Sequence, residues 1–130
     1  SVVSPSCHDM STIRGWWEED SALTQRFYNH LLGHFGDSPQ FCEPWVCREV
    51  IMQHLHAPAM WAIFPIQDLV AMDGRLRLED PLAEQINVPS NPKHYWRFRF
   101  HMSMEDLLQA NDFNKTLSDL VTLSGRDGVV

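Results

Sequence analysis

The sequence has few cysteines, few basic residues and no long hydrophobic run, and each shortage excludes a class of protein. Three cysteines are too few for a disulfide framework, and an odd number cannot all be paired, so we expect reduced thiols in a cytoplasmic protein. Ten Lys and Arg against 17 Asp and Glu give a net charge of −7, which disfavours nucleic acid as a partner. No run approaches ~18 apolar residues and no signal-peptide pattern opens the chain, so we expect no membrane partner.

The length of the chain limits its architecture. At 130 residues it is expected to form one unit, residues 1–130, without a linker or an internal repeat. This is only half of the ~250 residues that a complete (β/α)8 barrel requires. We expect residues 124–130 to be a frayed tail.

Helical patterns account for most of the sequence. Asp20 is a typical cap for a helix that ends near Gly33, and Pro44 is a typical first residue for a second helix that ends before Pro58. Shorter helical patterns follow at residues 66–72, at 103–108, where Ser103 is a typical cap, and at 112–121, where Asp112 is a typical cap.

Two short apolar runs have the pattern of strands in a parallel sheet. The first is Val2–Val3, and the second, residues 60–65, is continuous and bounded by prolines, which is typical of a strand buried on both faces. His8-Asp9 and Gln67-Asp68 follow these runs. Because α/β folds place functional side chains at the carboxyl ends of parallel strands, we predict an α/β fold with these polar pairs at its site. The alternative for Asp9 is that it caps a helix over residues 10–20.

Five tryptophans offer flat apolar surfaces that would suit a sugar ring. We expect Trp45 and Trp61 to fill the core, since they lie on an apolar stripe and in a buried run. For Trp16, Trp17 and Trp96, which have charged neighbours, stacking on a sugar and core filling are equally plausible.

Several histidines and cysteines resemble metal ligands only superficially. His30 and His34 have helical spacing, but Cys42 and Cys47 are further apart than the paired ligands of structural zinc sites. We expect no metal and no cofactor.

Residues 75–101 have no clear period and include three prolines and a dense run of polar and aromatic residues. Long segments of this kind are usually functional.

Three segments carry a family resemblance. They read Ser-Cys-His-Asp-Met-Ser-Thr-Ile-Arg-Gly-Trp-Trp-Glu-Glu-Asp at 6–20, Ala-Pro-Ala-Met-Trp-Ala-Ile-Phe-Pro-Ile-Gln-Asp-Leu at 57–69, and Ile-Asn-Val-Pro-Ser-Asn-Pro-Lys-His-Tyr-Trp-Arg-Phe-Arg at 86–99. In this order they resemble the carboxyl-terminal part of the 4-α-glucanotransferases, the amylomaltases or disproportionating enzymes of the α-amylase clan. Within this family the three segments resemble the branch that includes the plant cytosolic disproportionating enzyme.

The resemblance implies a (β/α)8 barrel that transfers α-1,4-linked glucosyl or maltosyl units between glucans with retention. A nucleophilic Asp and an acid/base Glu ~5 Å apart perform such chemistry. The resemblance further implies that Asp9, after the seventh strand, stabilises the transition state by holding sugar hydroxyls, and that His8 contacts the same sugar. Gln67 and Asp68 would lie near the substrate after the eighth strand. The other substrate-binding residues it implies are Trp16, Asn87, Asn91, His94 and Trp96.

No segment resembles the strands that carry the nucleophile and the acid/base. We therefore expect a carboxyl-terminal piece of the barrel, about two βα units with following helices, that is mostly helical and inactive alone. Strands without their neighbours leave an apolar face, so we expect a homodimer. A glycan-binding module that uses exposed tryptophans is the alternative, and an interaction protein with no sugar ligand is a weaker one.

Overall fold

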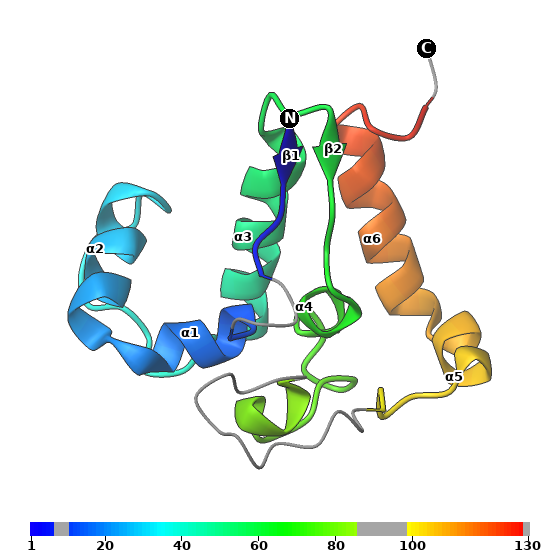
Figure 1. Ribbon diagram of the computed structural model, residues 1–130, viewed down its shortest axis with the longest axis horizontal. Helices are drawn as coiled ribbons and strands as arrows, with labels where there is room; N and C mark the ends of the chain where they lie inside the picture. The colour runs from blue at the N-terminus through cyan, green and yellow to red at the C-terminus, as the bar shows by residue number, and fades with distance from the viewer. Residues whose placement is uncertain (7–10, 86–98, 129–130) are drawn as a thin grey trace.

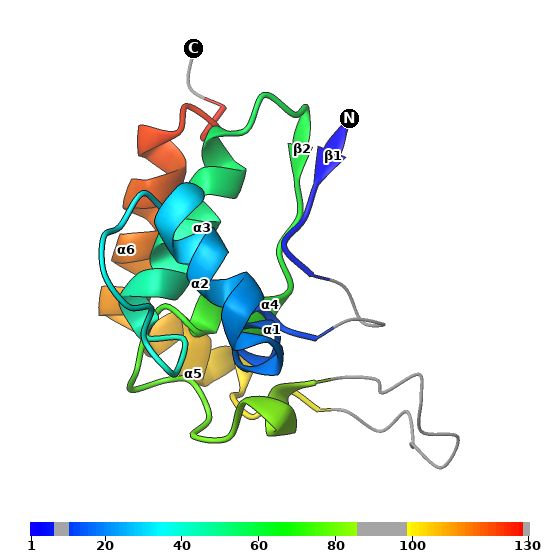
Figure 2. The same ribbon diagram turned by 90° about the vertical axis from the view of Figure 1, so that its left-hand side faces the viewer.

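The computed structural model describes residues 1–6, 11–85 and 99–128, which form helices packed behind a small parallel sheet (Figures 1 and 2). The elements are β1 (Val2–Val3), α1 (Ile13–Glu19), α2 (Ser21–His30), α3 (Pro44–His56), β2 (Trp61–Ala62), α4 (Ile66–Val70), the 3-10 helix η1 (Pro81–Glu84), α5 (Met104–Gln109) and α6 (Asn111–Leu123). Within these ranges no helix combines the length and the apolar composition of a membrane span.

The two strands pair in parallel, as the sequence predicts. Val2 lies opposite Trp61 and Val3 opposite Ala62, and the Ile63 amide extends the pairing by donating to the Val3 carbonyl at 2.9 Å. Parallel pairing brings both carboxyl ends to one edge of the sheet. The chain segments that follow β1 and β2 therefore begin side by side (Figure 1).

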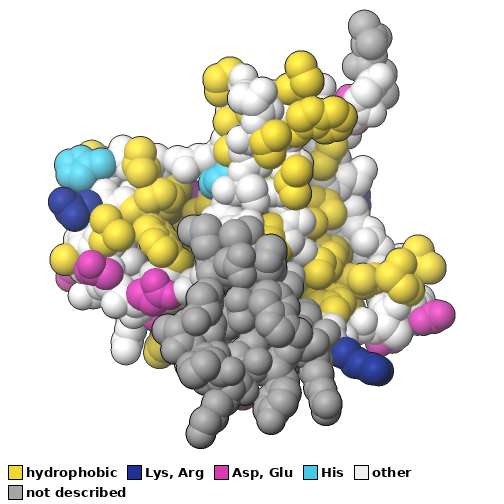
Figure 3. Space-filling model, in the orientation of Figure 1, with side chains coloured by type: hydrophobic (Ala, Val, Ile, Leu, Met, Phe, Trp, Pro, Cys, Tyr) yellow, Lys and Arg dark blue, Asp and Glu magenta, His cyan; other side chains and the backbone are white. Residues whose placement is uncertain are grey.

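The prediction that residues 60–65 are buried on both faces is wrong. The helices lie on one side of the strand pair in Figure 2, and the side chains of Val2, Met60, Trp61 and Ile63 are exposed. Figure 3 shows apolar side chains gathered on this face around the two strands. The physical reason is that, among the described residues, no layer covers this face.

Helix α3, the helix predicted to begin at Pro44, supplies the centre of the core. Its buried residues are Val46, Cys47, Val50, Ile51 and Leu55. The same core includes Trp17 of α1, Tyr28 of α2 and Leu120 of α6. Helices α1, α2 and α6 therefore share one hydrophobic core with α3. The core is thus helical, and the sheet lies at its border.

Two of the predicted helix caps are confirmed and one is wrong. Asp20 accepts hydrogen bonds from the first amides of α2, and Ser103 caps α5 in a capping box. Helix α1 begins at Ile13 and is capped by Thr12, which accepts from the Gly15 amide at 3.1 Å, so α1 is shorter than the alternative helix over residues 10–20; Asp9 itself lies outside the described residues. Asp112 lies inside the first turn of α6 instead of preceding it.

The tryptophans are distributed differently from the expectation. Trp17 is 1% exposed and donates its indole N–H to the Pro39 carbonyl at 2.8 Å, whereas Trp45 and Trp61 are 42% and 62% exposed. Trp45 lies in the first turn of α3, away from the buried stripe, and Trp61 lies on the uncovered strand. The prediction that these two fill the core is wrong. Trp17 cannot serve as a stacking platform for a glycan, which weakens the binding-module alternative.

The part of the expected tail that the structure describes is anchored through Arg126. Its guanidinium donates to the carbonyls of Leu55, Ala57 and Ala59 at 2.6–2.8 Å. These contacts fix the turn between α3 and β2 to the end of α6.

Cys42 and Cys47 are free thiols that lie together in the core, with their sulfur atoms 3.3 Å apart. The hydrogen bond to Cys47 and burial raise the pKa of the Cys42 thiol. In the described residues no group of three or more His, Cys, Asp or Glu side chains has the arrangement of a metal site.

Candidate functional site

The carboxyl ends of β1 and β2 lead into a cluster of buried polar side chains. Five residues from four segments form this buried polar cluster: Ser6, Arg14, Gln67, Asp68 and Glu84. Each is less than 8% exposed. Buried polar groups are tolerated when they are hydrogen-bonded, and these side chains largely satisfy one another and the nearby backbone.

Asp68 connects the two segments that leave the strands. Pro65 ends the strand backbone and precedes α4, which places Gln67 and Asp68 in the first turn of that helix. One carboxylate oxygen of Asp68 accepts from the Ser6 hydroxyl, and the other accepts from the Ile13 amide at 2.9 Å. Asp68 is 0% exposed, so both of its oxygens are used inside the protein.

Arg14 and Glu84 form a buried ion pair that joins α1 to η1. Their closest nitrogen and oxygen atoms are 3.1 Å apart, and both side chains are almost completely buried. Arg14 also donates to the carbonyls of Leu78 and Glu79, at 2.6 and 3.0 Å. The same Glu84 oxygen accepts from the Leu78 amide at 2.9 Å. This pair therefore fixes the backbone just before η1.

Gln67 connects α4 to η1, the 3-10 helix that contains Glu84. Its side-chain amide donates to the Glu84 carbonyl at 3.3 Å, near the start of residues 86–98. The buried polar cluster thus contains residues close to His8-Asp9 in the sequence and residues close to the motif that begins at residue 86.

Burial raises the pKa of the Asp68 carboxyl above its ordinary value of 3.8. The hydrogen bonds from Ser6 and Ile13 oppose this shift, and the nearby Glu84 adds to it.

Because the pKa of Asp68 is raised in the folded state, the free energy of unfolding depends on pH through this group. The neutral carboxyl contributes stability that is fully present below about pH 3.8 and is lost as the pH rises through the folded-state pKa. Asp68→Asn removes this titration, so the stability of the wild type relative to the variant should fall as the pH rises. Urea unfolding of both proteins at a series of pH values measures this difference. A difference that does not change with pH would contradict the prediction.

The predicted site residues fall into two groups. Gln67 and Asp68 lie together at the predicted edge, while Trp16 is half-buried on α1, with its ring 5.3 Å from that of Phe27. The remaining predicted residues lie outside the described part of the chain: His8, Asp9, Asn87, Asn91, His94 and Trp96.

Three members of the cluster, Ser6, Arg14 and Glu84, were not predicted. Arg14 carried one usable signal, because a charged residue between apolar positions of a helix requires a buried partner. Ser6 and Glu84 lie in stretches where short-range sequence patterns give no indication of burial.

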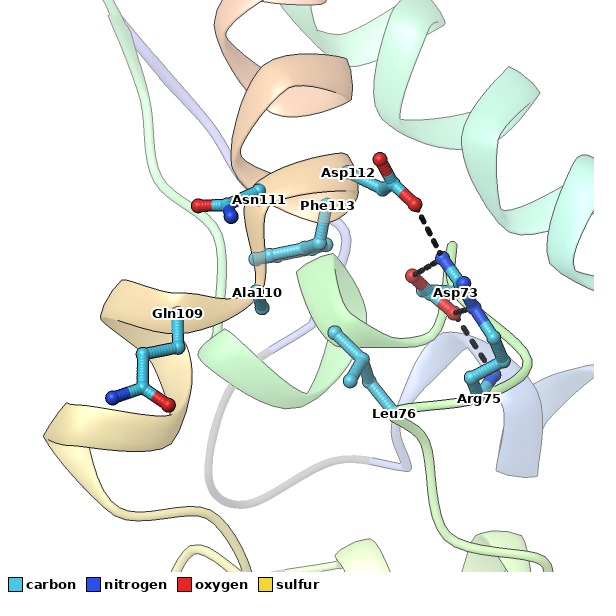
Figure 4. A pocket seen from close by; sticks show the side chains of 8 residues that line it. All are labelled: Asp73, Arg75, Leu76, Gln109, Ala110, Asn111, Asp112 and Phe113. Atoms are coloured by element: carbon cyan, nitrogen blue, oxygen red, sulfur yellow. Dashed lines mark hydrogen bonds and ion pairs between the residues drawn. The ribbon is translucent and has the colours of Figure 1, made fainter.

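A pocket between the end of α4 and the junction of α5 and α6 contains none of the candidate residues. Figure 4 shows its lining, which comprises Asp73, Arg75, Leu76, Gln109, Ala110, Asn111, Asp112 and Phe113. Arg75 is paired with Asp73 and Asp112 at its rim, at 3.5 and 3.2 Å. The pocket is therefore not assigned to the site.

Comparison with known proteins identifies the family. A family model described as 4-alpha-glucanotransferase matches residues 1–105, which include both strands and the whole buried polar cluster. The chain belongs to the 4-alpha-glucanotransferase family.

Individual relatives agree with this assignment. The chain is 48% identical over 126 residues to 4-alpha-glucanotransferase DPE2 of Oryza sativa subsp. japonica, a match that covers 97% of the chain and 13% of the relative. It is 30% identical over 121 residues to a 4-alpha-glucanotransferase of Chlamydia muridarum, covering 92% of the chain and 22% of that protein. It is 29% identical over 125 residues to 4-alpha-glucanotransferase DPE1, chloroplastic/amyloplastic, of Arabidopsis thaliana, covering 96% and 19%. The chain thus spans between 13% and 22% of the length of these relatives.

Proposed function

We propose that the chain is the carboxyl-terminal part of the (β/α)8 barrel of a retaining 4-α-glucanotransferase. The full-length enzyme would transfer α-1,4-linked glucosyl or maltosyl units from one glucan to the 4-hydroxyl of another. The match of the family model to residues 1–105 carries this proposal. The parallel pairing of β1 and β2, the pairing that neighbouring barrel strands have, supports it.

Within this enzyme, Asp9 would stabilise the transition state and His8 would contact the same sugar. An oxocarbenium-like transition state flattens the sugar ring, and hydrogen bonds to its 2-hydroxyl strengthen as it forms. A carboxylate that accepts these bonds lowers the barrier because it binds the transition state more tightly than the ground state. The nucleophile and the acid/base would come from parts of the barrel that precede this chain.

The substrate would be a malto-oligosaccharide or a longer α-1,4-glucan. Contacts with this substrate from Trp16, Gln67 and Asn87 remain predictions, as do those from Asn91, His94 and Trp96. For Asp68 the hydrogen bonds favour a supporting role, which is developed below. The cytoplasmic location also remains a prediction.

The exposed apolar face around β1 and β2 supports the proposal that further barrel strands cover it in the full-length protein. Val2, Trp61 and Ile63 each expose more than half of their surface there, and apolar patches of this kind are usually contact surfaces. In the separate 130-residue chain the same face would be buried in a homodimer. Such a chain would carry Asp9 without a nucleophile and would therefore be inactive.

The test is to incubate the full-length protein with maltotriose. We expect free glucose together with maltopentaose and longer glucans, and an α-configuration at each newly formed bond. The separate 130-residue chain should give none of these products. Release of glucose without longer glucans would contradict transfer as the main reaction, and turnover by the separate chain would contradict the proposal that it lacks the catalytic pair.

A further inference from the structure

Asp68 is a buried carboxylate that bridges the side-chain hydroxyl of Ser6 and the backbone amide of Ile13, one on either side of residues 7–10. Ser6 lies just before this segment and Ile13 begins the helix after it, and each donates a hydrogen bond to a different oxygen of Asp68. The segment contains His8 and Asp9. A single side chain from α4 thus holds both ends of the segment that carries the proposed transition-state stabiliser.

The two ends are rigid on their other sides. The strand pairing holds β1 just before Ser6, and Thr12 and Arg14 hold the start of α1 through the helix cap and the buried ion pair. The Ile13 amide lies in the first turn of α1, where backbone amides have no partner within the helix. Asp68 supplies that partner and, in doing so, fixes the start of α1 relative to β1.

Burying this carboxylate costs free energy that an apolar side chain at position 68 would not cost. No Lys or Arg among the described residues forms an ion pair with Asp68 to offset this cost. A residue retained only for stability would be poorly chosen here. A residue that must accept one hydrogen bond on each of two oxygens is well served by a carboxylate.

We propose that Asp68 is a positioning residue, which sets the separation and orientation of Ser6 and Ile13, the described residues on either side of the segment that contains His8 and Asp9. This inference rests on the function proposed above. Asp68 acts through the segment that it ties, since neither of its oxygens faces solvent. A shift of ~1 Å in a catalytic group can lower a rate by ~10²-fold, so the loss of the two hydrogen bonds to Asp68 should lower kcat measurably.

The experiment compares Asp68→Ala, Asp68→Asn and Ser6→Ala in the full-length protein, with maltotriose as the substrate. We expect Asp68→Ala to lower kcat by roughly 10- to 100-fold with KM changed by less than about threefold, because the loss falls on the transition state. Asp68→Asn should recover most of kcat, since an amide oxygen can accept from the Ile13 amide and its NH2 group can donate to the Ser6 hydroxyl. Ser6→Ala, which removes one of the two bonds, should lie between them.

Asp119→Ala is the matched control, because Asp119 is an exposed carboxylate on α6 that pairs with Lys115 on the same helix. It should leave kcat unchanged. Wild-type kcat in Asp68→Ala would overturn the proposal. Equal losses of kcat in Asp68→Ala and Asp68→Asn would also overturn it. If Asp68→Ala does not fold, Ser6→Ala decides, and wild-type kcat in that variant would overturn the proposal.

Hydrogen exchange of the Ile13 amide separates this inference from the proposed function, because it requires no catalysis. Exchange should be faster in Asp68→Ala than in the wild type and unchanged in Asp119→Ala. A full-length protein that does not transfer glucan would refute the proposed function. Faster exchange of the Ile13 amide in Asp68→Ala would even then support the conclusion that Asp68 fixes the start of α1. Unchanged exchange at Ile13 in Asp68→Ala would refute the positioning role of Asp68, whatever the activity of the variant.

Discussion

Asp9→Asn in the full-length protein is expected to lower kcat for glucan transfer by roughly 10²- to 10⁴-fold and to leave the unfolding temperature nearly unchanged. The substitution keeps the size of the side chain but removes its charge. Charged acceptors form hydrogen bonds about twice as strong as neutral ones, and those to the 2-hydroxyl tighten in the transition state. Most of the loss should therefore appear in kcat and little in KM. Steady-state kinetics with maltotriose, together with thermal unfolding, measure both quantities.

Asp119→Asn provides the control for this experiment. It makes the same chemical change on the exposed face of α6 and should leave kcat and KM at wild-type values. A nearly normal kcat in Asp9→Asn would remove Asp9 from the proposed role. A large fall in unfolding temperature would indicate a structural role for Asp9 instead.

Arg14→Met in the 130-residue chain is expected to lower the free energy of unfolding by about 3–5 kcal/mol. Methionine matches the length of the arginine stem but leaves Glu84 buried without a cation. It also leaves the carbonyls of Leu78 and Glu79 without the donors that Arg14 supplies. Urea unfolding followed by the fluorescence of the buried Trp17 measures the change.

Two further variants test whether the buried pair causes this loss. Arg75→Met removes an exposed cation that also pairs with carboxylates, and its effect should be small because solvent screens such pairs. Arg14→Met combined with Glu84→Leu should recover part of the stability, since neither charge is then left alone. A loss below about 1 kcal/mol in Arg14→Met would show that the pair contributes little.

Signals that act over a few residues were sufficient to predict much of this fold. Asp20, Pro44 and Ser103 each mark a helix start because their preferences depend on nearby backbone amides or on a fixed φ angle. The two apolar runs also predicted a parallel pair of strands, and the pairing of β1 with β2 confirms it.

Burial was predicted less well because it depends on what packs against a residue. Trp61 lies in an apolar run that resembles a covered strand, yet no layer of the described residues covers it. Trp17 has acidic neighbours in the sequence, yet the packing of α1 against α2 and the Pro39 carbonyl encloses it. The neighbours that decide exposure lie outside the short windows in which periodicity can be observed.

The sequence by itself determined where α2, α3 and α5 begin, the parallel strand pattern and the resemblance that identifies the family, because each depends on residues that are close together in the chain. Only the tertiary structure decided that Asp68 accepts from Ser6 and Ile13 and that Arg14 meets Glu84. Ser6 and Asp68 are 62 residues apart in the chain, and no local preference links them. They meet because parallel strand pairing brings two carboxyl ends together, and a buried carboxylate at that edge must accept whichever donors the fold supplies.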